Sequence, residues 1–279
     1  MAVEREPAES AAALREGAIA IARAAAAAIL QVYETDFDVQ RKLDTSPLTR
    51  ADLAAHRIIV EGLERMTPDI PVLSEESVED VPFEVRRHWS RLWLVDPLDG
   101  TREFVKRNGE FSVNLALVED GEVVFGVVLA PVGGALWHAR RGLGACRRDG
   151  EHDIAIATRR PPSMPLRVAA SRSHRDPRSA RLLDRIAART GGIEAVALGS
   201  SLKFCRIAEG GMDVYPRLGP TSEWDTAAGQ CVLEAAGGAV LDLRARPLRY
   251  NQRETLLNGD FIALGDPVLP WEEWVSGRD

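Results

Sequence analysis

The segment Asp96–Thr101, with the sequence DPLDGT, constrains the fold of this chain more than any other. It directly follows the apolar run Leu92–Val95, which is typical of a short strand buried in a sheet. The end of that strand therefore carries two carboxylates, a proline-stiffened bend, a glycine and a hydroxyl. These oxygen ligands suit a hard divalent cation such as Mg²⁺, although local turn preferences alone also explain an Asp-Pro and Asp-Gly bend.

Helical and strand patterns alternate along the rest of the chain. Helices are predicted over residues 18–30, 51–63, 177–189, 203–209 and 226–236. Strands are predicted over residues 72–73, 92–95, 112–117, 122–129, 167–170, 193–198 and 240–243, with further strand and turn signals through 135–156. This interleaving predicts a layered α/β sandwich. The proline-rich stretch 160–165 is the expected boundary between an N-terminal α+β subdomain (1–160) and a C-terminal α/β subdomain (161–279).

Composition excludes several classes of partner. The 279 residues carry a net charge of −7, which provides no basic field for a nucleic acid polymer. Cys146, Cys205 and Cys231 lack metal-binding spacing and indicate free, mostly buried thiols in a reducing compartment. Neither a secretory signal nor an apolar run long enough to span a bilayer is present. A cytoplasmic protein is expected, with peripheral inner-membrane association and a homodimer left open.

Three further acidic residues are candidates to join Asp96 and Asp99. Glu75 also follows a short apolar strand, and two such strand ends often lie side by side; alternatively it belongs to a solvated acidic loop. Asp225 starts a helix, where an aspartate often serves only as the N-cap. Asp52 falls in the first turn of another helix, where a carboxylate complements the helix dipole.

Convergence of these carboxylates would require cations. Two carboxylates about 4 Å apart repel by about 4 kcal/mol at an effective dielectric constant of 20. Two or three Mg²⁺ ions would neutralise such a cluster, polarise a phosphoryl oxygen and position a water for in-line attack. The spacing in the sequence does not by itself establish that the side chains meet.

Three segments together resemble the inositol monophosphatase superfamily, whose members are Mg²⁺-dependent, lithium-sensitive phosphatases of small phosphorylated metabolites. They are Asp96–Thr101, residues 74–77 (SEES) and residues 224–228 (WDTAA), in the order that is typical of the family. The resemblance covers about residues 18–263, nearly the whole chain. It implies a layered αβαβα sandwich of the sugar phosphatase type.

The resemblance also implies a set of metal ligands. Glu75, Asp96 and the carbonyl group of Leu98 would hold one Mg²⁺, and Asp96, Asp99 and Asp225 would hold a second. Glu75 would also help to place a weaker third ion through water. Leu98, Asp99 and Asp225 would therefore lie beside the substrate as well.

The catalytic residues implied by the resemblance are Glu75, Asp52 and Thr101. Thr101, hydrogen-bonded to Asp52, corresponds to the pair that orients and activates the attacking water. The backbone amides of Gly100 and Thr101 would face the phosphate. A glycine at position 100 agrees with this role, because a backbone that approaches a ligand closely favours the absence of a side chain.

Further segments are most similar to the bisphosphate nucleotidase branch of the superfamily. They span residues 99–114, 171–174, 199–205 and 215–221. This resemblance implies that the nucleotide is bound by His174, Ser200, Lys203 and Arg217. The charges of Lys203 and Arg217 and the hydroxyl of Ser200 would be available to its second phosphate. Taken singly, each residue also fits a structural role, as a loop histidine, a solvated lysine or an ion-pairing arginine.

The implied reaction is hydrolysis of the 3'-phosphate of 3'-phosphoadenosine 5'-phosphate to AMP and phosphate, without a covalent phosphoenzyme. The phosphosulfate analogue is a second candidate substrate, and the implied role is clearance of a by-product of sulfur metabolism. An inositol monophosphatase or fructose-1,6-bisphosphatase on the same fold is the alternative. A non-catalytic metabolite-binding regulator is a further one, which damaged metal ligands would favour.

Overall fold

The structure is a computed structural model that describes residues 8–34, 39–41, 47–171 and 177–276. Its helices are α1 (Ala8–Tyr33), α2 (Arg50–Met66), α3 (Phe83–Arg86), α4 (Thr101–Val105), α5 (Pro177–Thr190), α6 (Leu202–Ala208), α7 (Glu223–Ala235) and α8 (Trp271–Val275), with a 3-10 helix η1 (Glu75–Asp80). Within these described ranges, no helix is long and apolar enough to cross a membrane.

The strands form two main sheets. The first has seven strands in chain order, β3 (Val72–Ser74), β4 (Arg91–Asp99), β5 (Ser112–Glu119), β6 (Glu122–Leu129), β7 (Leu136–Arg140), β8 (Gly144–Asp149) and β9 (His152–Ile156). The second has the order β11-β10-β12-β16-β14, from β10 (Leu166–Ser171), β11 (Ile193–Leu198), β12 (Val214–Arg217), β14 (Ala239–Asp242) and β16 (Phe261–Leu264). Two small ribbons pair β1 (Val39–Arg41) with β2 (Pro47–Thr49) and β13 (Thr221–Ser222) with β15 (Leu257–Asn258).

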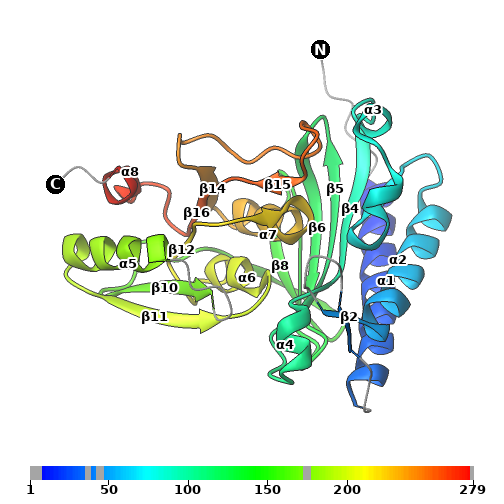
Figure 1. The fold of residues 1–279 in the computed structure, drawn as a ribbon, viewed down its shortest axis with the longest axis horizontal. Coiled ribbons are helices and arrows are strands. Elements are labelled where there is room, and N and C mark those ends of the chain that lie inside the picture. The colour runs from blue at the N-terminus through cyan, green and yellow to red at the C-terminus, as the bar shows by residue number, and fades with distance from the viewer. Residues whose placement is uncertain (1–7, 35–38, 42–46, 172–176, 277–279) are drawn as a thin grey trace.

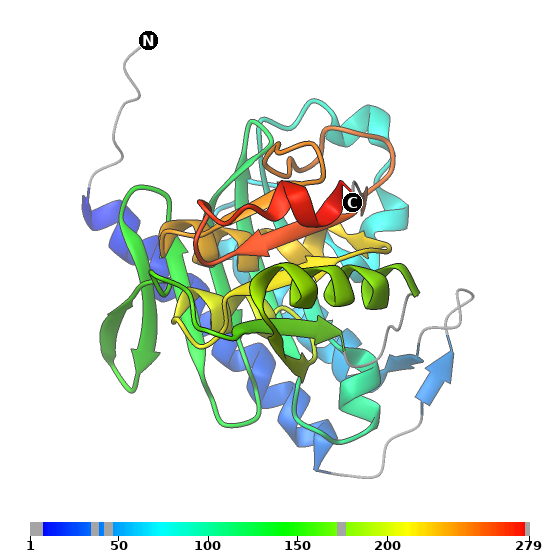
Figure 2. The same ribbon diagram turned by 90° about the vertical axis from the view of Figure 1, so that its left-hand side faces the viewer.

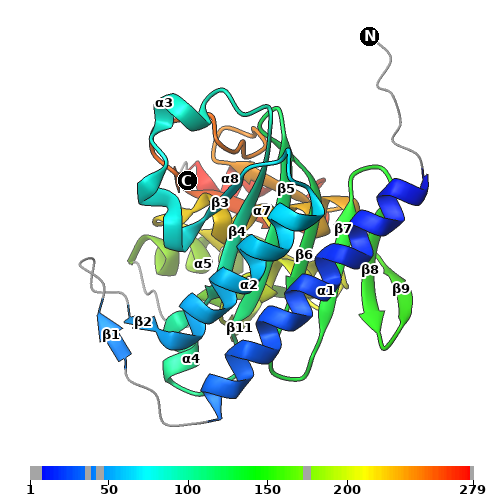
Figure 3. The same cartoon turned by 90° about the vertical axis from the view of Figure 1, so that its right-hand side faces the viewer.

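These elements stack in five layers (Figure 1). Helices α1 and α2 lie side by side across one face of the seven-stranded sheet (Figure 3). Helices α6 and α7 separate its other face from the five-stranded sheet, and α5 and α8 cover the outer face of that second sheet (Figure 2). The expected αβαβα sandwich is therefore confirmed.

The outer helix layer depends on small residues where α1 meets α2. Four alanines of α1 are buried, which lets the two helices pack closely: Ala18, Ala22, Ala25 and Ala26. A Cβ added at Gly62 of α2 would lie 2.8 Å from the side chain of Ile21. Larger residues at this contact would push the helices apart, because protein interiors leave few voids to absorb added volume.

Two boundaries differ from the sequence prediction in ways that affect the acidic residues. Strand β4 does not end at Val95 but continues to Asp99, with a register irregularity against β5 between Asp96 and Asp99. Helix α7 begins at Glu223, so the N-cap is Ser222 and not Asp225. The interpretation of Asp225 as a simple N-cap is therefore wrong; it occupies the third helical position of a capping box.

The proline-rich stretch 160–165 lies between the last strand of the first sheet and the first strand of the second. The largest core cluster nevertheless draws residues from both sheets and from α6 and α7. The division into two subdomains remains a prediction. Because α7 packs against β4, Asp225 lies close to Asp96 and Asp99.

Candidate active site

Two neighbouring strands bring Glu75 and Asp96 together. Strands β3 and β4 are parallel, with Ser74 opposite Val95. Glu75 and Asp96 directly follow these paired residues, so the two acids lie on neighbouring segments, as the sequence predicted. Burial is the main cause of the raised pKa of Asp96, and the negative charge of Glu75 raises it further.

Asp96, Asp99 and Asp225 form the centre of the site. Each offers a carboxylate oxygen within 4.8 Å of those of the other two. Asp96 is 1% exposed, and its Oδ1 accepts a hydrogen bond from the backbone N–H of Leu98 at 3.0 Å. The irregular end of β4 thus turns Asp96 and Asp99 toward one space, and the capping box of α7 delivers Asp225 to it.

Electrostatics make this cluster costly without a cation. Burial, followed by the charges of neighbouring acids, raises the pKa values of Asp96 and Asp225 well above their ordinary range. Burial also raises the pKa of Asp99, against the opposing influence of Lys203 and of hydrogen bonds from Ser201. Buried carboxylates in this arrangement are stabilised by metal coordination. The donor set therefore fits a hard divalent cation.

Ser201 and Asn114 support the cluster from behind and were not singled out from the sequence. Ser201 contacts Oδ2 of Asp99 with its backbone N–H at 2.6 Å and with its hydroxyl at 2.8 Å. The amide of Asn114 donates to the Ser201 hydroxyl at 2.9 Å. Both lie inside segments that carried the family resemblance, 99–114 and 199–205, and that placement was the available signal.

Gly100 and Thr101 lie at the turn from β4 into α4. Gly100 adopts φ +93°, and an added Cβ would lie 3.2 Å from the carbonyl oxygen of Glu110. A side chain here would be both strained and crowded. The Thr101 hydroxyl lies 3.5 Å from the carbonyl oxygen of Leu98. Asp52, in the first turn of α2, is 1% exposed and its charge also acts on Asp96. The Thr101–Asp52 hydrogen bond remains a prediction.

Lys203 is a buried lysine, and the expectation of a solvated helix residue is wrong. Its Nζ donates to the carbonyl oxygens of Ser200 at 2.6 Å and Leu198 at 3.2 Å, and lies 5.1 Å from the centre of the Tyr215 ring. Burial lowers the pKa of Lys203 to about 8, against the attraction of Asp99. Lys203 thus holds the loop before α6 and keeps its charge beside the acidic cluster.

Arg217 is also buried near the cluster, and its charge acts on Asp225. Its guanidinium donates to the carbonyl oxygen of Pro220 at 3.0 Å, while Nε is buried without a hydrogen-bond partner in the described part of the chain. Ser200 adopts φ +48° at the start of α6. His174 lies outside the described residues.

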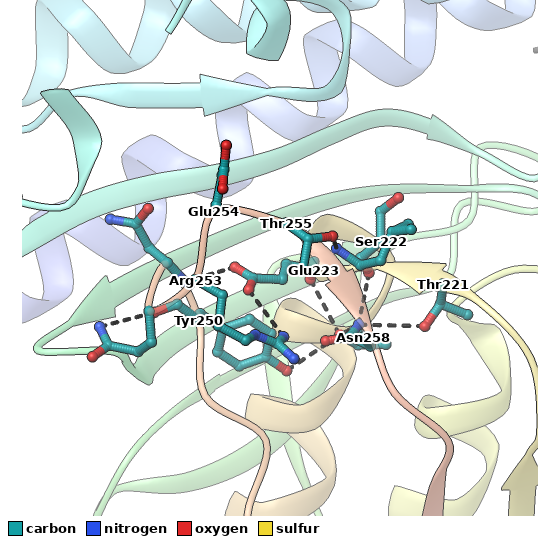
Figure 4. Close-up of polar contacts among 12 residues, drawn as sticks. Thr221, Ser222, Glu223, Tyr250, Arg253, Glu254, Thr255 and Asn258 are labelled. Atoms are coloured by element: carbon teal, nitrogen blue, oxygen red, sulfur yellow. Dashed lines mark hydrogen bonds and ion pairs between the residues drawn. The ribbon is translucent and has the colours of Figure 1, made fainter. Parts of the chain in front are cut away.

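A second polar network anchors the start of α7, where Asp225 sits (Figure 4). Glu223, 0% exposed, accepts a hydrogen bond from the backbone N–H of Asn251 at 2.6 Å and lies 3.4 Å from the guanidinium of Arg253. Asn258 donates to the carbonyl oxygen of Ser222 at 2.9 Å. The long segment between β14 and β15 therefore fixes the helix end that carries the third aspartate.

Arg86 completes this network from α3. It donates to the Asn251 side chain at 2.7 Å and to the carbonyl oxygens of Arg253 at 3.1 Å and Glu254, and it accepts a bond from Asn251 at its own carbonyl. Burial raises the pKa of Glu223, and hydrogen bonding to Asn251 and the charges of Arg253 and Arg86 oppose that rise. The sequence contained no local signal for this contact.

We expect Arg86→Met to destabilise the protein by about 3 kcal/mol at pH 8, because it leaves the Asn251 side chain and the carbonyl oxygens of Arg253 and Glu254 without their buried donor. It also removes a positive charge that acts on Glu223. Equilibrium urea unfolding measures this change. The neighbouring Arg87→Met is the matched control, since Arg87 is exposed, pairs with Glu84 at the surface and lies over the Phe83 ring. Equal effects of the two substitutions would contradict a special role for Arg86.

Comparison with known proteins gives this arrangement a family. Residues 11–265 match the model of the inositol monophosphatase family. The chain belongs to that family. The family fold is also evident in a solved inositol monophosphatase from Zymomonas mobilis, which aligns with a TM-score of 0.76 and 27% identity over 97% of this chain and 98% of that one.

Within the inositol monophosphatase family, the chain is similar to several bisphosphate nucleotidases that share the name CysQ. The chain is 49% identical over 245 residues to the 3'(2'),5'-bisphosphate nucleotidase CysQ of Escherichia coli strain K12, covering 86% of this chain and 95% of the relative. The crystal structure of CysQ from Bacteroides thetaiotaomicron aligns with a TM-score of 0.76 and 40% identity over 89% and 96% of the two chains. The resemblance recognised in the sequence is confirmed.

Proposed function

We propose that this chain is a phosphoric monoester hydrolase that removes the 3'-phosphate from 3'-phosphoadenosine 5'-phosphate to yield AMP and phosphate. The observation that carries the proposal is the 49% identity with a bisphosphate nucleotidase over 245 residues. The cluster of Asp96, Asp99 and Asp225 supports it, because buried carboxylates with raised pKa values are suited to a divalent cation and not to an empty core.

Asp96, Asp99, Asp225, Glu75 and the carbonyl group of Leu98 are the residues that would hold two or three Mg²⁺ ions. When bound, these ions supply Lewis-acid polarisation of the phosphoryl oxygen and charge for the leaving oxygen. The hydrogen bonds from Ser201 to Asp99, and from Asn114 to Ser201, hold the carboxylate in place before the reaction begins.

The chain's own residues would then orient the attacking water. Asp52 and Thr101 come from the starts of α2 and α4, and Thr101 presents the only hydroxyl of the DPLDGT segment. In this proposal Thr101 holds the water and Asp52 accepts its proton. The amides of Gly100 and Thr101, at the start of α4, would bind phosphate oxygens.

Preference for a nucleotide would come from two positively charged side chains close to the carboxylates. Lys203 and Arg217 are buried near Asp99 and Asp225, so their charges remain strong there and favour a second phosphate. Because Lys203 also bonds two carbonyl oxygens, its role combines loop support with attraction of the anion. Hydrolysis of inositol monophosphate is the second candidate function, supported by the 27% identity and TM-score of 0.76 with a Zymomonas mobilis inositol monophosphatase.

Phosphate release from 3'-phosphoadenosine 5'-phosphate and from inositol 1-phosphate, each with Mg²⁺, with EDTA and with added Li⁺, tests this proposal. We expect strong preference for the nucleotide, loss of turnover in EDTA and inhibition by Li⁺. Preference for inositol 1-phosphate would transfer Lys203 and Arg217 to structural roles. Absence of turnover on both substrates would refute the proposed activity.

A further inference from the structure

Three ligand types of different chemistry meet on the seven-stranded sheet, away from the acidic cluster. His138 of β7, Cys146 of β8 and Asp153 of β9 each offer a nitrogen, sulfur or oxygen atom within 4.8 Å of the others. These strands form the edge of the sheet opposite to β3 and β4. The group is thus separate from the carboxylates that the proposed hydrolysis uses.

The sheet itself sets this arrangement. His138 lies directly opposite Cys146 in the antiparallel pairing of β7 with β8. Asp153 lies opposite Arg148, two residues along β8 from Cys146. Because side chains two apart on a strand share a face, all three ligands project to the same side. Paired antiparallel strands, and not a loop, therefore hold the three ligands.

Asp153 is already paired within this group, because Arg148 and Arg15 both lie within ion-pair distance of its carboxylate. His138, 5% exposed, shares a hydrogen bond of 2.8 Å between Nε2 and Oδ1 of Asp153. Arg148 donates to the same oxygen at 2.5 Å, and its two terminal nitrogens also bond the carboxylate of Glu16 on α1 at 2.8 and 3.1 Å. If a cation took the Asp153 oxygen, Glu16 would continue to neutralise Arg148.

We propose that His138, Cys146 and Asp153 bind a borderline-soft divalent cation such as Zn²⁺. Imidazole, thiolate and carboxylate are all zinc ligands, and three of them leave one position of a tetrahedron for water. The Cys146 thiol releases its proton to solvent as the metal–sulfur bond forms. Mg²⁺ would not compete, because it favours oxygen ligands. This site is independent of the proposed hydrolysis.

Cobalt(II) titration of the full chain in excess Mg²⁺ tests the site. We expect a near-ultraviolet thiolate-to-cobalt charge-transfer band that Zn²⁺ bleaches. Cys146→Ser should abolish the band, and His138→Gln should weaken Co²⁺ binding at least tenfold. Cys231→Ala is the matched control and should retain it, since Cys231 lies in the core.

Asp96→Asn separates this site from the acidic cluster. The band should persist in Asp96→Asn, which removes one of the clustered carboxylates. In addition, Zn²⁺ should raise the melting temperature of the wild-type chain in excess Mg²⁺, and this increase should be absent from Cys146→Ser. No band in the wild-type chain, or a band that survives Cys146→Ser, would overturn the proposal.

Discussion

Replacing Asp96 with asparagine is expected to abolish phosphate release while making the metal-free protein harder to unfold. Asparagine retains the shape of the side chain and the oxygen that accepts the Leu98 N–H, so the fold is preserved. It removes the charge needed by a divalent cation, which contributes several kcal/mol to catalysis. The expected loss of kcat/KM is therefore on the order of 10³-fold or more.

The same substitution should increase the stability of the metal-free protein for an electrostatic reason. In the metal-free protein at pH 8, Asp96 is buried beside Glu75, Asp99 and Asp225, and both burial and these charges raise its pKa. Removing the charge should therefore stabilise the apo protein at this pH, since each unit of such a shift corresponds to about 1.4 kcal/mol.

Steady-state assays in Mg²⁺ and urea unfolding in EDTA measure the two effects of Asp96→Asn. Asp184→Asn on the exposed face of α5 is the matched control and should change neither. Retained turnover in Asp96→Asn at saturating Mg²⁺ would refute the metal assignment. Lower stability of this variant in EDTA would show that the carboxylate stabilises the fold by itself.

The second large effect is a pH-dependent stabilisation by Mg²⁺. The folded-state pKa values of Asp96 and Asp225 lie above the ordinary value of 3.8, so the metal-free fold binds more protons than the unfolded chain. The contribution of these two groups to stability is therefore complete below about pH 4 and decreases as pH rises toward their folded pKa values. Bound Mg²⁺ removes this loss.

The difference in melting temperature between 10 mM Mg²⁺ and EDTA, at matched ionic strength, should thus grow from pH 5 to pH 8. At a concentration about 100-fold above Kd, binding adds about 2.7 kcal/mol, or roughly 5 °C for a chain of this size. Taking a difference at each pH cancels the titration of groups outside the cluster, such as His56. A constant difference, or one that persists in Asp225→Asn, would contradict this linkage.

Local patterns in the sequence predicted a large part of the fold. The apolar runs before Glu75 and Asp96 identified two strands that pair in parallel, with Ser74 at the end of β3 opposite Val95 of β4. The turn at 119–121 identified the β5–β6 hairpin, whose residues Asp120 and Gly121 both adopt positive φ. These features were readable because a strand period, a turn residue and a strand end are set within a few neighbouring residues.

The same reasoning was less accurate where tertiary contacts decide. Strand β4 continues past Val95 because β5 still pairs with it at Asp99. A solvated Lys203 is one expectation from helix periodicity, yet the side chain is buried against carbonyl oxygens and the Tyr215 ring. Helix periodicity cannot show what the opposite layer presents to a side chain.

Local patterns in the sequence were sufficient to predict the layered α/β class, the family and the acidic residues that gather in the site. How those acids are held depends on contacts between distant segments. Ser201 reaches Asp99 across 102 positions, and Arg86 reaches Asn251 across 165. No period or local propensity links residues so far apart; their pairing follows from the need of buried polar groups to find partners once the layers have packed together.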